Sequence, residues 1–71
     1  MQTEELIRLA NQIGDFFKAY GPEQAKRDIA AHINSYWEPR MRQALLAHVD
    51  VGGKGLDELV LSAMPLVKKP T

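Results

Sequence analysis

The 71-residue sequence predicts an all-α fold, a small bundle of three to four short helices. Apolar residues recur at three- and four-residue spacing in successive segments, which is the period of an amphipathic helix. Proline-containing breaks at residues 21–22 and 38–39 separate these segments, and no strand-like alternation of apolar and polar residues is present. At this length we expect one helical domain, residues 1–67, followed by a solvated C-terminal tail, residues 68–71.

The first helix is expected over residues 3–20, because apolar side chains at helical spacing occupy one of its sides and polar side chains the other. Gly14 lowers the stability of a helix by about 1 kcal/mol relative to alanine, so we interpret it as a close crossing of two helices. Gly21 and Pro22 then end this helix and open the next, since glycine favours the position after a helix and proline its first turn.

The second helix is expected over residues 22–37, with His32 on its apolar face. We interpret His32 as a core histidine with Asp28, one turn earlier, as its candidate hydrogen-bond partner. His48 follows sixteen residues later with no cysteine in the chain. This spacing predicts neither a zinc site nor a catalytic histidine.

The third helix is expected to begin at Pro39 and to run to about residue 50, because proline disfavours helical geometry in the residue before it. Arg40 and Arg42 then lie at the positive end of the helix dipole, where each cation is less favourable than an acid by roughly 0.3–1 kcal/mol. Two explanations are open: the arginines cap the last carbonyls of the second helix or pair with Glu38, or they reach groups on another chain. We favour the second explanation slightly.

The loop at residues 51–55 contains three glycines and Lys54, but it lacks the first glycine and the Ser/Thr of a Walker phosphate loop. We interpret it as a helix C-cap and connector. A fourth helix is expected over residues 56–67, with Pro65 weakening its last turn. It is apolar nearly all round, and three short helices cannot enclose a fourth, so part of it should face a partner or cause self-association of the isolated chain.

The balance of charge and the absence of cysteine narrow the class of function. Nine basic residues balance nine acidic residues, so the chain lacks the basic surplus expected of a nucleic-acid-binding domain. No apolar segment approaches the roughly 18 residues of a membrane span, and the N-terminus lacks the cations of a signal peptide. We therefore expect a cytoplasmic protein with no catalytic, metal or cofactor site of its own.

We expect partner binding to centre on the turn that contains the single tryptophan, because large aromatic and arginine side chains are enriched at interface hot spots. The alternative, of equal weight, is that Trp37 fills the core. The predicted partner-binding residues, from this turn and from the last helix, are Tyr36, Trp37, Glu38, Arg40, Met41, Arg42, Leu59, Leu61 and Met64.

Three blocks of the sequence resemble the delta subunit of NAD-dependent, molybdenum-containing formate dehydrogenase. Residues 6–13 read LIRLANQI, residues 32–42 read HINSYWEPRMR, and residues 52–60 read GGKGLDELV. The resemblance spans nearly the whole chain and is most specific in the central block. The sequence departs from the pattern at Met64-Pro65, where an uninterrupted alanine-rich helix is expected.

The resemblance implies an accessory subunit that catalyses nothing itself, stabilises the catalytic (alpha) subunit and assists its acquisition of the molybdenum cofactor. The molybdenum bis-pyranopterin, iron–sulfur clusters and flavin of such an enzyme are then expected in the larger subunits. Two other functions stay open, a transient maturation chaperone of the same enzyme and a small helix-turn-helix DNA-binding domain built around residues 38–39.

Overall fold

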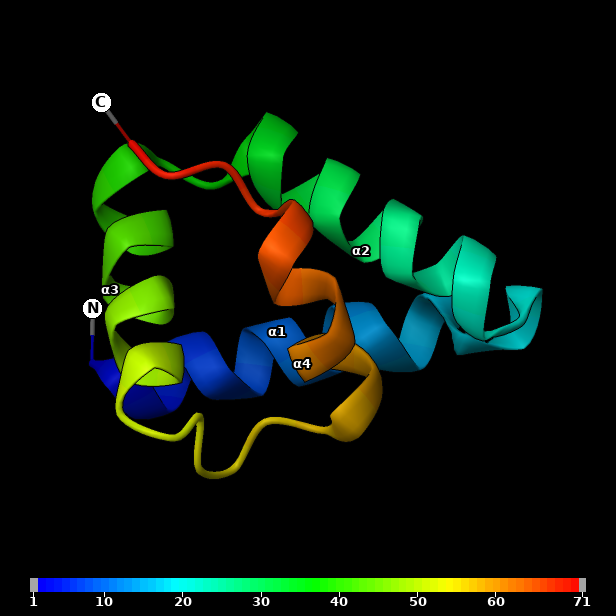
Figure 1. The fold of residues 1–71 in the computed structure, drawn as a ribbon, viewed down its shortest axis with the longest axis horizontal. Helices are drawn as coiled ribbons and strands as arrows, with labels where there is room; N and C mark the ends of the chain where they lie inside the picture. The colour runs from blue at the N-terminus through cyan, green and yellow to red at the C-terminus, as the bar shows by residue number, and fades with distance from the viewer. Residues whose placement is uncertain (1, 71) are drawn as a thin grey trace.

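The computed structural model describes residues 2–70, which form four α-helices and two 3-10 turns (Figure 1). The elements are α1 (Thr3–Phe17), η1 (Lys18–Tyr20), α2 (Pro22–Tyr36), α3 (Pro39–Asp50), α4 (Glu58–Ala63) and η2 (Met64–Leu66). The predicted all-α class is confirmed, and α3 has the predicted bounds. Met1 and Thr71, the ends of the expected domain and tail, lie outside the described residues.

Three helices form a frame around the fourth. In Figure 1, α1 runs along the bottom, α2 returns along the top, α3 closes the left side, and α4 lies between them. The short helix α4 packs mainly against α2 and also against α1. The core therefore lies around α4, and its fully buried side chains come from all four helices: Leu6, Ile29, Ile33, Leu45 and Val60.

The close helix crossing that the sequence predicts at Gly14 is present, and the structure shows that α4 is the helix that crosses α1 there. An added Cβ at Gly14 would lie 2.7 Å from Cγ2 of Val60, a separation that real Cβ atoms do not show. Both residues are buried, so the neighbouring helix has little room to move away. Glycine lowers the helix propensity of α1 at this position, but it allows the Val60 side chain to pack directly against the α1 backbone.

The glycine-rich loop caps α3, which confirms the interpretation as a C-cap and connector. The amide of Gly53 donates to the carbonyl of His48 at 3.0 Å, and that of Gly52 donates to Val49 at 3.0 Å, the hydrogen-bond pair of a Schellman motif. Gly53 has a φ of +64°, and an added Cβ there would meet Leu61 at 2.6 Å. The positive φ favours glycine at this position, and any other residue would also push the Leu61 side chain aside.

The expectation that the last helix exposes surplus apolar surface is wrong for most of its residues. The α-helical part ends at Ala63, and the chain tightens into η2, where Pro65 has no amide to continue an α-helical ladder. Val60, Met64 and Val67 are buried. Because α4 has only six residues and lies inside the frame, the neighbouring helices can cover it. Among the large apolar residues of α4 and η2, Leu66 is the exposed one.

Two asparagine side chains fix the segments on either side of α4. Asn11 donates from Nδ2 to the carbonyl of Gly55 at 2.9 Å, and its Oδ1 accepts from the amide of Asp57 at 3.0 Å. Asn34 donates in the same way to the carbonyl of Leu66 at 3.1 Å and accepts from the amide of Lys68 at 2.8 Å. Each side-chain amide thus satisfies one backbone carbonyl and one backbone N–H that no other described residue pairs.

We predict that Asn34→Asp lowers the free energy of unfolding by about 1–2 kcal/mol, since a carboxylate keeps the bond from Lys68 but cannot donate to Leu66. Thermal unfolding followed by circular dichroism measures the change. Gln43→Glu is the matched control, because it makes the same chemical change at an exposed position that forms no hydrogen bond among the described residues. Equal melting temperatures of the two variants would show that the Asn34 bridge adds nothing.

Candidate functional site

The structure divides the nine predicted partner-binding residues among three environments. Tyr36, Glu38 and Arg40 are exposed, Met41, Arg42, Leu59 and Leu61 are half-buried, and Trp37 and Met64 are buried. In α4 and η2, Met64 belongs to the same core cluster as Trp37, and Leu59 and Leu61 pack against that core. The nine residues therefore do not form one continuous surface in the isolated chain.

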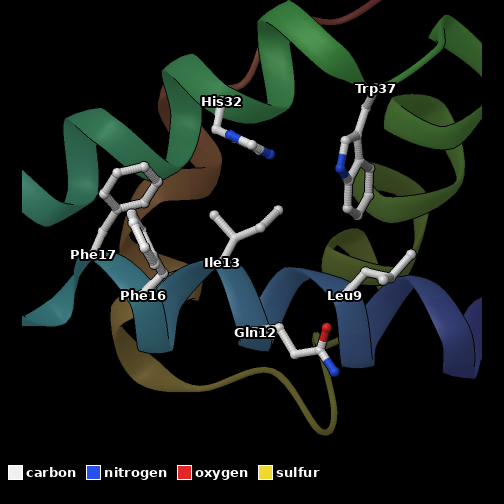
Figure 2. A pocket seen from close by; sticks show the side chains of 7 residues that line it. All are labelled: Leu9, Gln12, Ile13, Phe16, Phe17, His32 and Trp37. Atoms are coloured by element: carbon white, nitrogen blue, oxygen red, sulfur yellow. The ribbon is translucent and has the colours of Figure 1, made fainter.

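Trp37 belongs to the hydrophobic core, as the alternative interpretation of the sequence holds. Its residue is 7% exposed, and it packs in the same cluster as Leu6, Ile33 and Leu45. Its backbone leaves the helical region at the C-cap of α2, while its amide still donates to the carbonyl of Ile33 at 3.0 Å. This change of direction turns the indole from the end of α2 back toward α1 (Figure 2).

The two arginines that share the start of α3 have different surroundings. The guanidinium of Arg42 donates from Nη1 to the carbonyl of Trp37 at 2.8 Å and from Nε to the carbonyl of Lys68 at 3.1 Å. Arg42 therefore caps α2 and holds the start of the expected tail, as the capping alternative holds. Arg40 is exposed and forms no hydrogen bond or ion pair with any described residue.

We predict that Arg42→Lys lowers the free energy of unfolding by about 1 kcal/mol, because an ammonium group lacks the planar fork that reaches two carbonyls at once. Chemical denaturation of the isolated chain measures this loss. Arg40→Lys is the matched control, and its stability should equal that of the unchanged chain. A stable Arg42→Lys variant would mean that one hydrogen bond suffices at this position.

An apolar groove of about 390 Å³ lies between α1 and α2 (Figure 2). We call it the α1–α2 groove, and its lining consists of Leu9, Gln12, Ile13, Phe16, Phe17, His32 and Trp37. In Figure 2 the two phenylalanines close one end, Trp37 and Leu9 close the other, and His32 hangs over Ile13. Of these seven lining residues, only Trp37 is among the predicted partner-binding residues.

Exposed aromatic side chains flank the α1–α2 groove. Phe16 is 69% exposed and packs edge-on against Phe17, with 5.0 Å between the ring centroids. Tyr20 and Tyr36 are 62% and 75% exposed. The sequence analysis did not single out these adjacent phenylalanines, although successive residues of a helix point about 100° apart, which places one of such a pair toward the edge of the apolar face.

His32 is not the core histidine that the sequence predicted. It is half-buried, and its ring lies against Tyr36, with 4.8 Å between centroids, and against Phe17 at 6.3 Å. Asp28 instead accepts a hydrogen bond from Gln24 at 2.9 Å. Among the described residues, no hydrogen bond joins this imidazole to Asp28.

A second hollow of about 290 Å³ lies where the start of α3 meets α1. Glu38, Arg40 and Met41 line it together with Leu6 and Ala44. Three of the predicted partner-binding residues thus share one cavity. Leu6 lies one helical turn before Leu9 of the α1–α2 groove, so the two hollows follow each other along the same side of α1.

The described residues also bear on two functions other than protein binding, namely metal binding and membrane insertion. Residues 2–70 contain no group of three His, Cys, Asp or Glu side chains arranged to hold a metal ion. Within the same residues, every helix is too short or too polar to cross a membrane. The α1–α2 groove and the hollow at the start of α3 together form the candidate site for partner binding.

Comparison with known proteins identifies a family to which the chain is similar. The model of a protein family described as NADH-dependent formate dehydrogenase delta subunit FdsD matches residues 5–64. The matched range includes all of α2, α3 and α4 and most of α1. Searches of curated proteins and of solved structures found no match.

Proposed function

The chain belongs to the family of NADH-dependent formate dehydrogenase delta subunits, and from this premise we propose that it is a non-catalytic accessory subunit. Its role is to bind the catalytic (alpha) subunit, to stabilise it and to assist its acquisition of the molybdenum cofactor. Formate oxidation and electron transfer to NAD then belong to the larger subunits, which carry the molybdenum bis-pyranopterin, the iron–sulfur clusters and the flavin. The complex operates in the cytoplasm.

The observation that carries the proposed role is the exposed aromatic surface beside α1. Soluble monomers rarely gather several large apolar side chains in one exposed place unless a partner covers them. Here Phe16, Tyr20 and Tyr36 are each more than 60% exposed, and an apolar hollow lies between the helices that carry them. A domain of this size is also marginally stable alone, so binding a larger subunit would stabilise both.

Co-purification tests the proposed role. The tagged chain, purified from its native cells, is expected to bring the catalytic subunit with it at a fixed molar ratio. In cells that lack the chain, we expect less catalytic subunit and less molybdenum per molecule of it, as measured by quantitative immunoblotting and elemental analysis. Absence of the catalytic subunit from the purified material would contradict the proposal.

The same experiment separates a permanent subunit from a transient maturation chaperone. A permanent subunit stays at constant ratio in fully active, molybdenum-loaded enzyme. A chaperone is enriched on molybdenum-free catalytic subunit and is lost from the active enzyme.

The DNA-binding alternative would need free cations at the start of α3. Arg42, one of the two cations there, is instead engaged within the chain.

A further inference from the structure

The indole N–H of Trp37 is an unpaired donor at the edge of the α1–α2 groove. Only 7% of the Trp37 surface is exposed. Its indole N–H nevertheless forms no hydrogen bond among the described residues. Fully enclosed side-chain nitrogen or oxygen atoms without a partner are also absent from residues 2–70. The nitrogen therefore keeps some contact with solvent, and Figure 2 shows it on the side of the indole that faces His32 and the groove.

An open indole N–H in an apolar groove has a definite chemical preference. The indole nitrogen can only donate, and a buried tryptophan N–H normally has an acceptor. A partner that covers the groove must therefore bring an acceptor to Trp37, or it leaves the donor unpaired and loses affinity.

The lining of the groove also limits the charge of its occupant. The seven lining residues include no Asp, Glu, Lys or Arg, and Gln12 and His32 are the polar members among them. An ionised side chain that entered would lose its hydration without meeting an opposite charge. The groove therefore matches an uncharged segment with a large apolar side chain.

We propose that the α1–α2 groove binds an uncharged segment of the catalytic subunit, in which a large apolar side chain lies beside a free backbone carbonyl. The carbonyl accepts a hydrogen bond from the Trp37 indole, and the apolar side chain packs between Ile13, Phe16 and His32. The carbonyl comes from an extended segment or a helix C-terminus, because carbonyls inside a helix are already paired. This inference rests on the proposed function and adds to it the chemistry of the contact.

The single tryptophan of the chain permits a direct test. Expression in a tryptophan auxotroph supplied with benzothienylalanine changes Trp37 alone, keeping the bicyclic shape and replacing the N–H by sulfur. We measure its affinity for catalytic subunit purified from cells that lack the chain. The affinity is expected to fall about tenfold, and the melting temperature of the isolated chain should stay unchanged because the N–H has no partner there.

Gln12→Lys tests the charge limit, because it places a cation at an exposed lining residue. We expect it to weaken binding by about tenfold or more. Gln43→Lys makes the same change at an exposed position on α3 outside this groove, and its affinity should equal that of the unchanged chain.

The outcomes distinguish this inference from the proposed function. Failure of the unchanged chain to bind the catalytic subunit overturns the proposed function. Normal binding by the benzothienylalanine chain and by Gln12→Lys overturns the groove assignment alone. A dimer of the isolated chain that Gln12→Lys dissociates in sedimentation experiments also overturns it, since the occupant would then be a second copy.

Discussion

Trp37→Ala is expected to remove a large part of the stability of the isolated domain. Truncation of a buried tryptophan costs about 3–5 kcal/mol through lost burial and the cavity that remains. A 71-residue domain has a total free energy of unfolding of roughly 4–11 kcal/mol, so the variant should unfold at a much lower denaturant concentration than the unchanged chain. Far-UV circular dichroism and chemical denaturation of the isolated chain measure the loss.

Tyr36→Ala is the matched control for this prediction. Tyr36 precedes Trp37 in the sequence but is 75% exposed, and surface substitutions usually change stability by less than about 0.5 kcal/mol. Comparing the stabilities of the two variants therefore separates the effect of burial from that of position in the chain. A folded Trp37→Ala domain with a cooperative transition near that of the unchanged chain would contradict the assignment of Trp37 to the core.

Arg40→Glu is expected to weaken the complex with the catalytic subunit about thirtyfold, while the isolated domain keeps or gains stability. An interfacial arginine can contribute about 2 kcal/mol or more to binding. At the first turn of α3, however, an acid interacts better with the helix dipole than a cation, by about 0.3–1 kcal/mol. Arg40 also forms no hydrogen bond or ion pair with the described residues that the change would break. The two effects therefore have opposite signs.

The measurement is paired: the melting temperature of the isolated variant, and its affinity for the purified catalytic subunit. Arg27→Glu is the control, since it reverses an exposed charge on α2 that also forms no ion pair among the described residues. If Arg40→Glu unfolds the isolated domain, the arginine is structural. If the variant binds as tightly as the unchanged chain, the contact lies elsewhere.

The central block of the sequence, residues 32–42, has more structural roles than its composition indicated. Asn34 and Arg42 hold the backbone around Lys68, and Trp37 fills the core at the end of α2. These residues fix the C-terminal segment against the turn between α2 and α3. Tyr36, Glu38 and Arg40 are among the exposed positions of the block.

The sequence by itself determined the fold class, the bounds of α3 and the crossing at Gly14. These features depend on local chemistry: helical spacing of apolar residues, the geometry of proline at a first helical position, and the cost of glycine inside a helix. Pro22 and Pro39 begin α2 and α3 where the sequence places them. The family resemblance seen in the three blocks is confirmed over residues 5–64.

Only the tertiary structure decided which side chains face solvent. Trp37 and Phe16 are both large aromatic residues, yet one is 7% exposed and the other 69%. The difference depends on how α1, α2 and α4 pack, and contacts between residues far apart in the chain set that packing. The same holds for Asn11 and Asn34. The hydrogen-bond partners of Asn11 lie at least 44 residues away in the sequence and those of Asn34 at least 32, so no local pattern could reveal their roles.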